Sequence, residues 1–260
     1  MNYTDINADT IDKWVDGGWE WSVASTAEAY SAAKKGIWDV LLTPLISVPH
    51  HWFLPYLNGE RLDGVKLLGL ACGGGQQMPI FQALGAQCTV LDYSQRQLDR
   101  EREVADREGY DINIVRADMT KRLPFDDNCF DIIFHPVSNV YVEDVYHVWN
   151  ECYRVLRSGG ILLAGLDNGL NFLIDDEFID PPVIKNKLPF NPLKMDIGFR
   201  KKMIDNDEGI QFSHTAEEQI GGQLKAGLLL THLYEDTDNS VLGQYVPLFM
   251  ATRAIKGSIL

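Results

Sequence analysis

The pattern with the clearest chemical content is a run of three glycines, residues 73–75, that follows an apolar stretch at 65–71. Glycine lets a ligand approach the backbone closely, and a helix that begins there presents free amide N–H groups. A second apolar stretch, residues 87–91, is followed by Asp92, whose carboxylate can accept hydrogen bonds from both hydroxyls of a ribose. A glycine turn and an acid at a strand end together predict a site for an adenosine-containing cofactor.

The spacing of this glycine run argues against a dinucleotide cofactor. The dinucleotide fingerprint needs a third small residue at a fixed distance after the first two glycines. Counted from Gly73 and Gly75, that position is occupied by Met78. An NAD-dependent oxidoreductase is therefore disfavoured, and a different adenosine cofactor is expected.

His135 is the candidate catalytic residue, because it directly follows the apolar stretch at 130–134. An imidazole titrates near neutral pH and can act as a general base. The alternative, which we favour, is that His135 closes the cofactor pocket. Asn139, Tyr141 and, from the aromatic-rich N-terminal segment, Trp21 are candidate substrate contacts.

No metal site is predicted. His50 and His51 are adjacent, and neighbouring residues rarely chelate one ion, so we expect them to pack or to be solvated. The four cysteines show no Cys-x-x-Cys spacing and lie in or beside apolar runs, which indicates buried free thiols in a reducing compartment.

The elements that must hold these residues alternate along the middle of the chain. Five strands are predicted over residues 65–71, 87–91, 112–115, 130–134 and 161–166, with helices over 75–84, 95–108 and 145–156. This alternation predicts a parallel, doubly wound α/β sheet with helices on both faces. Because the ligand of such a sheet lies beyond the carboxyl ends of its strands, the glycine turn and Asp92 should meet there.

Two further regions flank this core. Residues 1–63 hold five of the six tryptophans and are expected to form a helical cover segment on the domain that spans 64–260. After the fifth strand, residues 167–213 are expected to form a lid, with an irregular, proline-rich stretch over 175–199. A helix over 214–223 and an antiparallel hairpin of strands over 228–233 and 246–254 should complete the sheet at one edge.

Five ordered motifs carry a resemblance to a known family: Gly-Leu-Ala-Cys-Gly-Gly-Gly at 69–75, Val-Leu-Asp-Tyr-Ser at 90–94, Arg-Ala-Asp-Met at 116–119, Phe-Asp-Ile-Ile-Phe-His at 130–135, and Arg-Val-Leu-Arg-Ser-Gly-Gly at 154–160. In these motifs the chain resembles the class I S-adenosylmethionine-dependent methyltransferases, in the type 11-like branch that methylates small molecules. The resemblance implies a Rossmann-like fold, S-adenosylmethionine as cofactor and methyl transfer as activity.

The resemblance also implies roles for single residues. Asp92 would hold the ribose, Tyr93 would pack near the adenine, Asp118 would accept a hydrogen bond from the adenine amino group, and the Met119 amide would meet a ring nitrogen. Two positions depart from the family pattern: Ala71 replaces a glycine, and Gly69 replaces an acid whose contact Gln76 or Gln77 would have to supply. The cofactor-binding set is then Ala71, Cys72, Gly73, Gly75, Gln76, Asp92, Tyr93, Asp118, Met119 and His135.

The composition of the chain limits the kinds of partner that it can bind. The chain has 260 residues and a formal net charge of -14, which repels phosphate backbones and disfavours nucleic acid. No apolar run is long enough for a signal peptide or a membrane span, so a cytoplasmic protein without a membrane partner is expected. The expected partner is a small-molecule methyl acceptor. The alternatives are a non-catalytic S-adenosylmethionine-binding protein and a methyltransferase that acts on a macromolecule.

Overall fold

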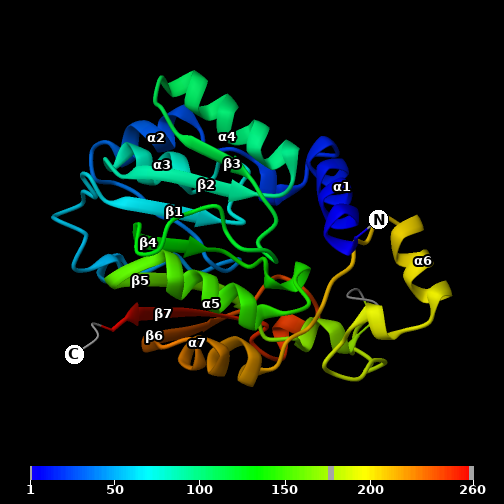
Figure 1. Ribbon diagram of the computed structural model, residues 1–260. Helices are drawn as coiled ribbons and strands as arrows, with labels where there is room; N and C mark the ends of the chain where they lie inside the picture. Colours follow the sequence, from blue (N-terminus) through cyan, green and yellow to red (C-terminus); the bar gives the residue numbers. More distant parts are fainter. Residues whose placement is uncertain (1, 175–178, 258–260) are drawn as a thin grey trace.

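One seven-stranded sheet in the order β3-β2-β1-β4-β5-β7-β6 forms the centre of the computed structural model, which describes residues 2–174 and 179–257 (Figure 1). Strands β1 to β5 pair in parallel, whereas β7 is antiparallel to both β5 and β6. The mostly parallel, doubly wound sheet and its C-terminal antiparallel hairpin are thus confirmed. The strands are β1 (Lys66–Leu70), β2 (Gln87–Asp92), β3 (Asn113–Arg116), β4 (Phe130–His135), β5 (Leu156–Asp167), β6 (Leu228–Asp236) and β7 (Phe249–Lys256).

The helices begin and end largely where capping residues direct them. The Ser94 hydroxyl accepts a hydrogen bond from the Gln97 amide at 3.1 Å, and Gly109 ends the same helix in the left-handed conformation. The helix after the glycine turn starts later than expected, because Gly74 and Gly75 have φ angles of 99° and 71°. The helices are α1 (Tyr3–Asp16), α2 (Ala27–Ala33), α3 (Met78–Ala83), α4 (Gln95–Glu108), α5 (Val145–Val155), α6 (Ile197–Asp205) and α7 (Gly222–Lys225).

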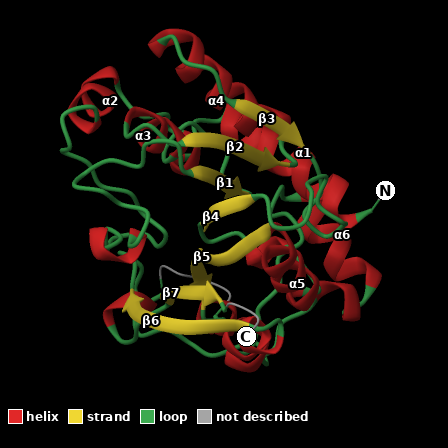
Figure 2. Ribbon diagram, turned by 60° about the vertical axis from the view of Figure 1, so that its left-hand side comes forward, coloured by secondary structure: helices red, strands yellow, loops and turns green. Residues whose placement is uncertain are grey.

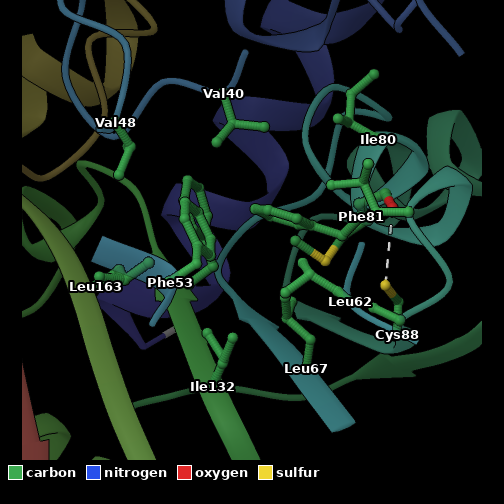
Figure 3. Packing of buried hydrophobic residues seen from close by; sticks show 14 of the residues in the cluster. Val40, Val48, Phe53, Leu62, Leu67, Ile80, Phe81, Cys88, Ile132 and Leu163 are labelled. Atoms are coloured by element: carbon green, nitrogen blue, oxygen red, sulfur yellow. Dashed lines mark hydrogen bonds between the residues drawn. The ribbon is translucent and has the colours of Figure 1, made fainter. Parts of the chain in front are cut away.

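Apolar side chains cover both faces of the sheet, as expected for parallel strands buried on two sides. On one face, Leu67, Ile132 and Leu163 pack with residues of α2, α3 and α4. Figure 3 shows Phe53 and Phe81 filling the centre of this cluster, and neither is exposed. The neighbouring strand positions point to the other face, where they pack against α5. No helix in the described ranges is long and apolar enough to cross a membrane.

The N-terminal segment is less helical than expected after α2. Between α2 and β1 its only helix is a short 3-10 turn, His50–Phe53, and the rest is irregular. Trp38 and Trp52 are nevertheless buried in the same cluster as the sheet, so this segment is part of the core. His50 stacks on Trp38 with ring centroids 3.9 Å apart, which agrees with a packing role for His50, while His51 is exposed.

The region expected to form a lid contains regular structure that the sequence reading missed. Helix α6 begins after Asp196, whose carboxylate accepts a hydrogen bond from the Phe199 amide at 2.9 Å. Figure 1 shows α6 on the side of the molecule where α1 lies. Residues 175–178 of the expected irregular stretch lie outside the described residues.

Arg154 on α5 holds the loop that follows β3. Its guanidinium donates hydrogen bonds to the carbonyls of Leu123 and Phe125 at 3.0 and 2.7 Å and pairs with Glu151 and Asp127. Glu151 in turn accepts a hydrogen bond from the Leu123 amide at 2.7 Å. The arginine thus fixes the loop whose first residues are the expected adenine contacts.

We expect Arg154→Met to lower the free energy of unfolding by about 3 kcal/mol, because it leaves the buried Glu151 carboxylate without its counter-charge and two carbonyls without their arginine donor. Urea denaturation followed by circular dichroism measures this change. The control is Arg122→Met, which removes an exposed arginine 3.6 Å from the same Asp127 and should cost less than about 1 kcal/mol. Equal losses in the two variants would contradict the role given to Arg154.

Candidate functional site

A cavity of about 580 Å³ opens at the carboxyl ends of the parallel strands. Figures 1 and 2 show these ends directed toward α1, which covers them from one side. The volume lies within the usual range for small-molecule sites. Its walls come from the ends of β1 to β5, from α1, from the 3-10 turn Glu20–Ser22 and from residues 41–44.

The glycine turn forms one wall, and close packing requires its small residues. The Gly73 amide donates a hydrogen bond to Oδ2 of Asp92 at 3.0 Å, and the Gly74 amide donates to the Gln97 carbonyl at 2.9 Å. A Cβ atom at Gly73 would lie 2.6 Å from Cβ of Gln97, so no larger residue fits beneath α4. Of the three glycines only Gly73 lines the cavity, and the Gly73 and Gly74 amides are bound by protein acceptors, so they are not the free N–H groups that the sequence predicted.

Asp92 lies where the sequence placed it, at the end of β2 and in the cavity wall. Its carboxylate accepts hydrogen bonds from the amides of Gly73 and Ser94, each at 3.0 Å. Burial raises its pKa, and the backbone hydrogen bonds oppose that shift. Because a carboxylate can accept about four hydrogen bonds, it keeps acceptor capacity for ligand hydroxyls.

A second acid supports the turn from behind, and sequence reasoning did not find it. Oε1 of Glu101, on α4, accepts a hydrogen bond from the Gly75 amide at 2.7 Å, and the side chain has no exposed surface. Desolvation raises the pKa of Glu101 to about 8. At Gly69, where the family has an acid, a Cβ atom would lie 2.6 Å from Sδ of Met78. Met78 fills that space, and the acid that supports the turn comes from α4 instead.

The structure brings most of the predicted residues into one wall. Ala71 adopts the left-handed conformation with φ of 47°, so it keeps the backbone shape that a glycine would give at this position. Oδ1 of Asp118 accepts a hydrogen bond from the Thr120 amide at 2.8 Å. The predicted residues that line the cavity are Ala71, Cys72, Gly73, Gln76, Asp92, Tyr93, Asp118 and Met119, with Trp21 and Tyr141.

Three predicted residues are not in the cavity lining: Gly75, His135 and Asn139. His135 has no exposed surface, and its ring nitrogens lie 2.8 Å from the Leu70 carbonyl and 2.9 Å from the Asn139 side chain. Burial lowers its pKa, which favours the neutral ring. The geometry therefore argues against His135 as a general base and against Asn139 as a substrate contact. Their hydrogen bonds join β4 to β1 and to the turn that follows β4.

Helix α1 is tied to both sides of the cavity. Oδ1 of Asp12 accepts hydrogen bonds from the Ser94 hydroxyl and the Arg96 amide, which joins α1 to the start of α4. On the other side, the Asn7 amide group exchanges two hydrogen bonds with the backbone of Ile210, at 2.9 and 2.6 Å. These side chains hold α1 as a cover over the strand ends.

Two buried polar atoms of lining residues have no partner within the described part of the chain: Oγ1 of Thr4 and Oε1 of Gln97. Unsatisfied buried polar atoms are costly, and a ligand that hydrogen-bonds them relieves this cost. With the glycine turn, the free acceptor capacity of Asp92 and a suitable volume, the lining fits S-adenosylmethionine.

Asp167 is a further lining residue that sequence reasoning missed. It ends β5, directly after the apolar stretch at 161–166, so the signal that identified Asp92 was also present here. Leu42, Val137 and Phe249 line the cavity on the same side. The cavity thus joins a polar side, at β1 to β3, to a more apolar side at β4, β5 and β7.

Comparisons with known proteins show the family of the chain. Residues 68–164 match the family described as a methyltransferase domain. A Bacillus subtilis (strain 168) protein named "Uncharacterized methyltransferase YbaJ" is 44% identical over 253 residues, which cover 96% of this chain and 97% of that protein. A solved S-adenosylmethionine dependent methyltransferase from Mesorhizobium loti has a TM-score of 0.61 at 19% identity, over 78% of this chain and 94% of that one. The geranyl diphosphate C-methyltransferase from Streptomyces coelicolor A3(2), solved with S-adenosyl-L-homocysteine, has a TM-score of 0.54 at 14% identity, over 79% and 77%.

The buried Glu101 predicts a pH dependence of stability. Its pKa rises from 4.5 to about 8 on folding, so between these values the folded chain binds more protons than the unfolded chain, and stability falls as pH rises. Glutamine keeps the acceptor oxygen and cannot ionise. We therefore expect the melting temperature of Glu101→Gln to fall less than that of the wild type between about pH 5 and 8.

Differential scanning calorimetry across this pH range tests the expectation. Glu103→Gln, an exposed acid on the same helix with a side chain 58% accessible, is the control and should follow the wild type. Parallel curves for Glu101→Gln and the wild type would show that Glu101 ionises normally.

Proposed function

The chain belongs to the class I S-adenosylmethionine-dependent methyltransferases, and we propose that its methyl acceptor is a small molecule bound at the β4–β5 side of the cavity. The observation that carries the proposal is that one cavity contains both the glycine turn with Asp92 and a separate, more apolar side. A cofactor on the first side and an acceptor on the second would share one cavity.

S-adenosylmethionine, when bound, supplies an electrophilic methyl group on a sulfonium. In our proposal Asp92 accepts hydrogen bonds from the ribose, and Asp118 and the Met119 amide hold the adenine. The backbone at Cys72 and Gly73, with the side chain of Gln76, holds the amino-acid end. Each of these residues lines the cavity, which supports the assignment.

The side chains of the protein position the acceptor and exclude water from the cavity. Methyl transfer from a sulfonium needs no side-chain nucleophile, so in-line positioning of the acceptor is the main task of the protein. Trp19 and Trp21 cover the cavity with α1, and Leu42 walls its apolar side. Both ring nitrogens of His135 are hydrogen-bonded inside the protein. If the acceptor must lose a proton, another group of the lining would therefore have to accept it.

A small acceptor is favoured over a macromolecule by enclosure and charge. The cavity is covered by α1, which is anchored on both of its sides by Asp12 and Asn7. The formal net charge of -14 opposes binding of a nucleic-acid backbone. Both features support a small molecule that enters the cavity whole.

Cofactor binding is tested by calorimetric titration of S-adenosylhomocysteine into the wild type and Asp92→Ala. The variant removes the charged acceptor for the ribose hydroxyls and should weaken binding roughly 10- to 100-fold. Asp99→Ala, an exposed acid on α4 with a side chain 42% accessible, is the control and should bind as the wild type does. Equal affinity of Asp92→Ala and the wild type would refute the role of Asp92.

Acceptor class is tested with cofactor labelled in the transferred methyl group. We expect label in the small-molecule fraction of a bacterial extract, and none in its protein or nucleic-acid fractions. Label in a macromolecular fraction would contradict the small-molecule proposal. Tight cofactor binding without transfer to any fraction would support a non-catalytic binding protein.

A further inference from the structure

The β4–β5 side of the cavity carries one charged group in a wall of apolar side chains with the uncharged polar residues Thr43, Ser138 and Asn171 among them. We call this part the acceptor pocket and define it by Leu42, Pro44, Val137, Asp167, Phe172 and Phe249. Asp167 and Phe249 are paired across β5 and β7, which fixes the acid beside an aromatic ring. The pocket is therefore shaped for an apolar molecule with one polar group.

The carboxylate of Asp167 is only partly satisfied by the protein. Oδ1 accepts a hydrogen bond from the Gly169 amide at 2.6 Å, and Oδ2 accepts one from Nδ2 of Asn171 at 2.8 Å. A carboxylate has room for about four such bonds. The residue is 6% exposed, and no cation of the described chain pairs with it.

Placing an unpaired carboxylate here opposes stability. Burial raises the pKa of Asp167 to about 6, and the nearby Asp238 carboxylate adds to the shift. A buried charge without a counter-charge is unfavourable unless a ligand completes the pair. The hydrogen bonds from Gly169 and Asn171 bring no counter-charge, so the acid points to a ligand of opposite charge.

The other charged residues that line the cavity are also acidic. The described residues that line the cavity include three carboxylates, Asp92, Asp118 and Asp167, and no lysine, arginine or histidine. A phosphate or carboxylate on the acceptor would meet like charges and find no cationic side chain of the lining to pair with. A cationic group would meet an acid already placed in the wall.

From this lining we propose that the acceptor is a small apolar molecule that carries a protonated amine, and that Asp167 pairs with this amine in the acceptor pocket. The proposal rests on the proposed function, because it names the substrate class of the same cavity. The amine anchors the molecule, and the apolar wall binds its body.

The test uses three probes with one apolar chain and different head groups: hexylamine, hexanol and hexyl phosphate. Each is titrated by calorimetry into the protein loaded with S-adenosylhomocysteine at about pH 7.5, where an alkylamine is protonated. We expect hexylamine to bind roughly tenfold more tightly than hexanol, and hexyl phosphate to show no binding. Hexyl phosphate binding as tightly as hexylamine, or no binding of hexylamine, would overturn the proposal.

Two variants distinguish direct pairing of the amine with Asp167 from a general effect of negative charge near the pocket. Asp167→Asn keeps the shape of the side chain and one acceptor oxygen for the Gly169 amide, but loses its charge and the second acceptor, and should bind hexylamine roughly tenfold more weakly. Asp238→Asn removes an equal charge at the turn after β6, outside the cavity lining, and should keep wild-type affinity. The same loss in both variants, or in neither, would overturn the assignment to Asp167.

Binding of S-adenosylhomocysteine to Asp167→Asn reports whether the variant is folded. If the wild type itself fails to bind S-adenosylhomocysteine, the proposed function fails. The hexyl titrations are then repeated on the protein alone, where the order of the three probes still decides whether the acceptor pocket prefers an amine.

Discussion

The absence of space between α4 and the turn after β1 is the constraint on which the site depends. A side chain at Gly73 would meet Gln97, and one at Gly75 would lie 3.0 Å from both the Arg100 carbonyl and Val104. The turn is therefore pressed against the helix, and its amides are bound by Asp92 and Glu101. Helix α1 is attached to the start of α4, so the cover of the cavity depends on the same contact.

Parallel pairing gathers distant residues at one place. The lining runs from Thr4 to Phe249, nearly the full length of the chain, because the strands deliver their carboxyl ends to one edge. The strand order decides how this edge is divided. Strands β1 to β3 give the polar side with its backbone turn, while β4, β5 and β7 give the apolar side.

The segment between α2 and β1 links the hydrophobic core to the apolar side. Trp38 and Phe53 are buried against the sheet, and Leu42 and Pro44, between them in sequence, line the cavity. The packing of the flanking aromatic residues thus holds the wall in place. Substitutions at 42–44 can alter the acceptor pocket while the sheet and the glycine turn stay unchanged.

The sequence by itself determined the strands, the glycine turn and the position of Asp92, because each depends on neighbouring residues: an apolar run, a cap or a glycine. The residues that it predicted for the cofactor line one cavity, except Gly75 and His135. Asp167 follows an apolar stretch as Asp92 does, so the same signal was present for it in the sequence. Only the tertiary structure decided that His135 and Asn139 bind each other inside the protein and that Glu101 supports the turn. These contacts join different elements, such as β1 with β4, where Leu70 and His135 lie 65 positions apart. Spacing along the chain carries no information about them, since they arise when the sheet brings its strands together.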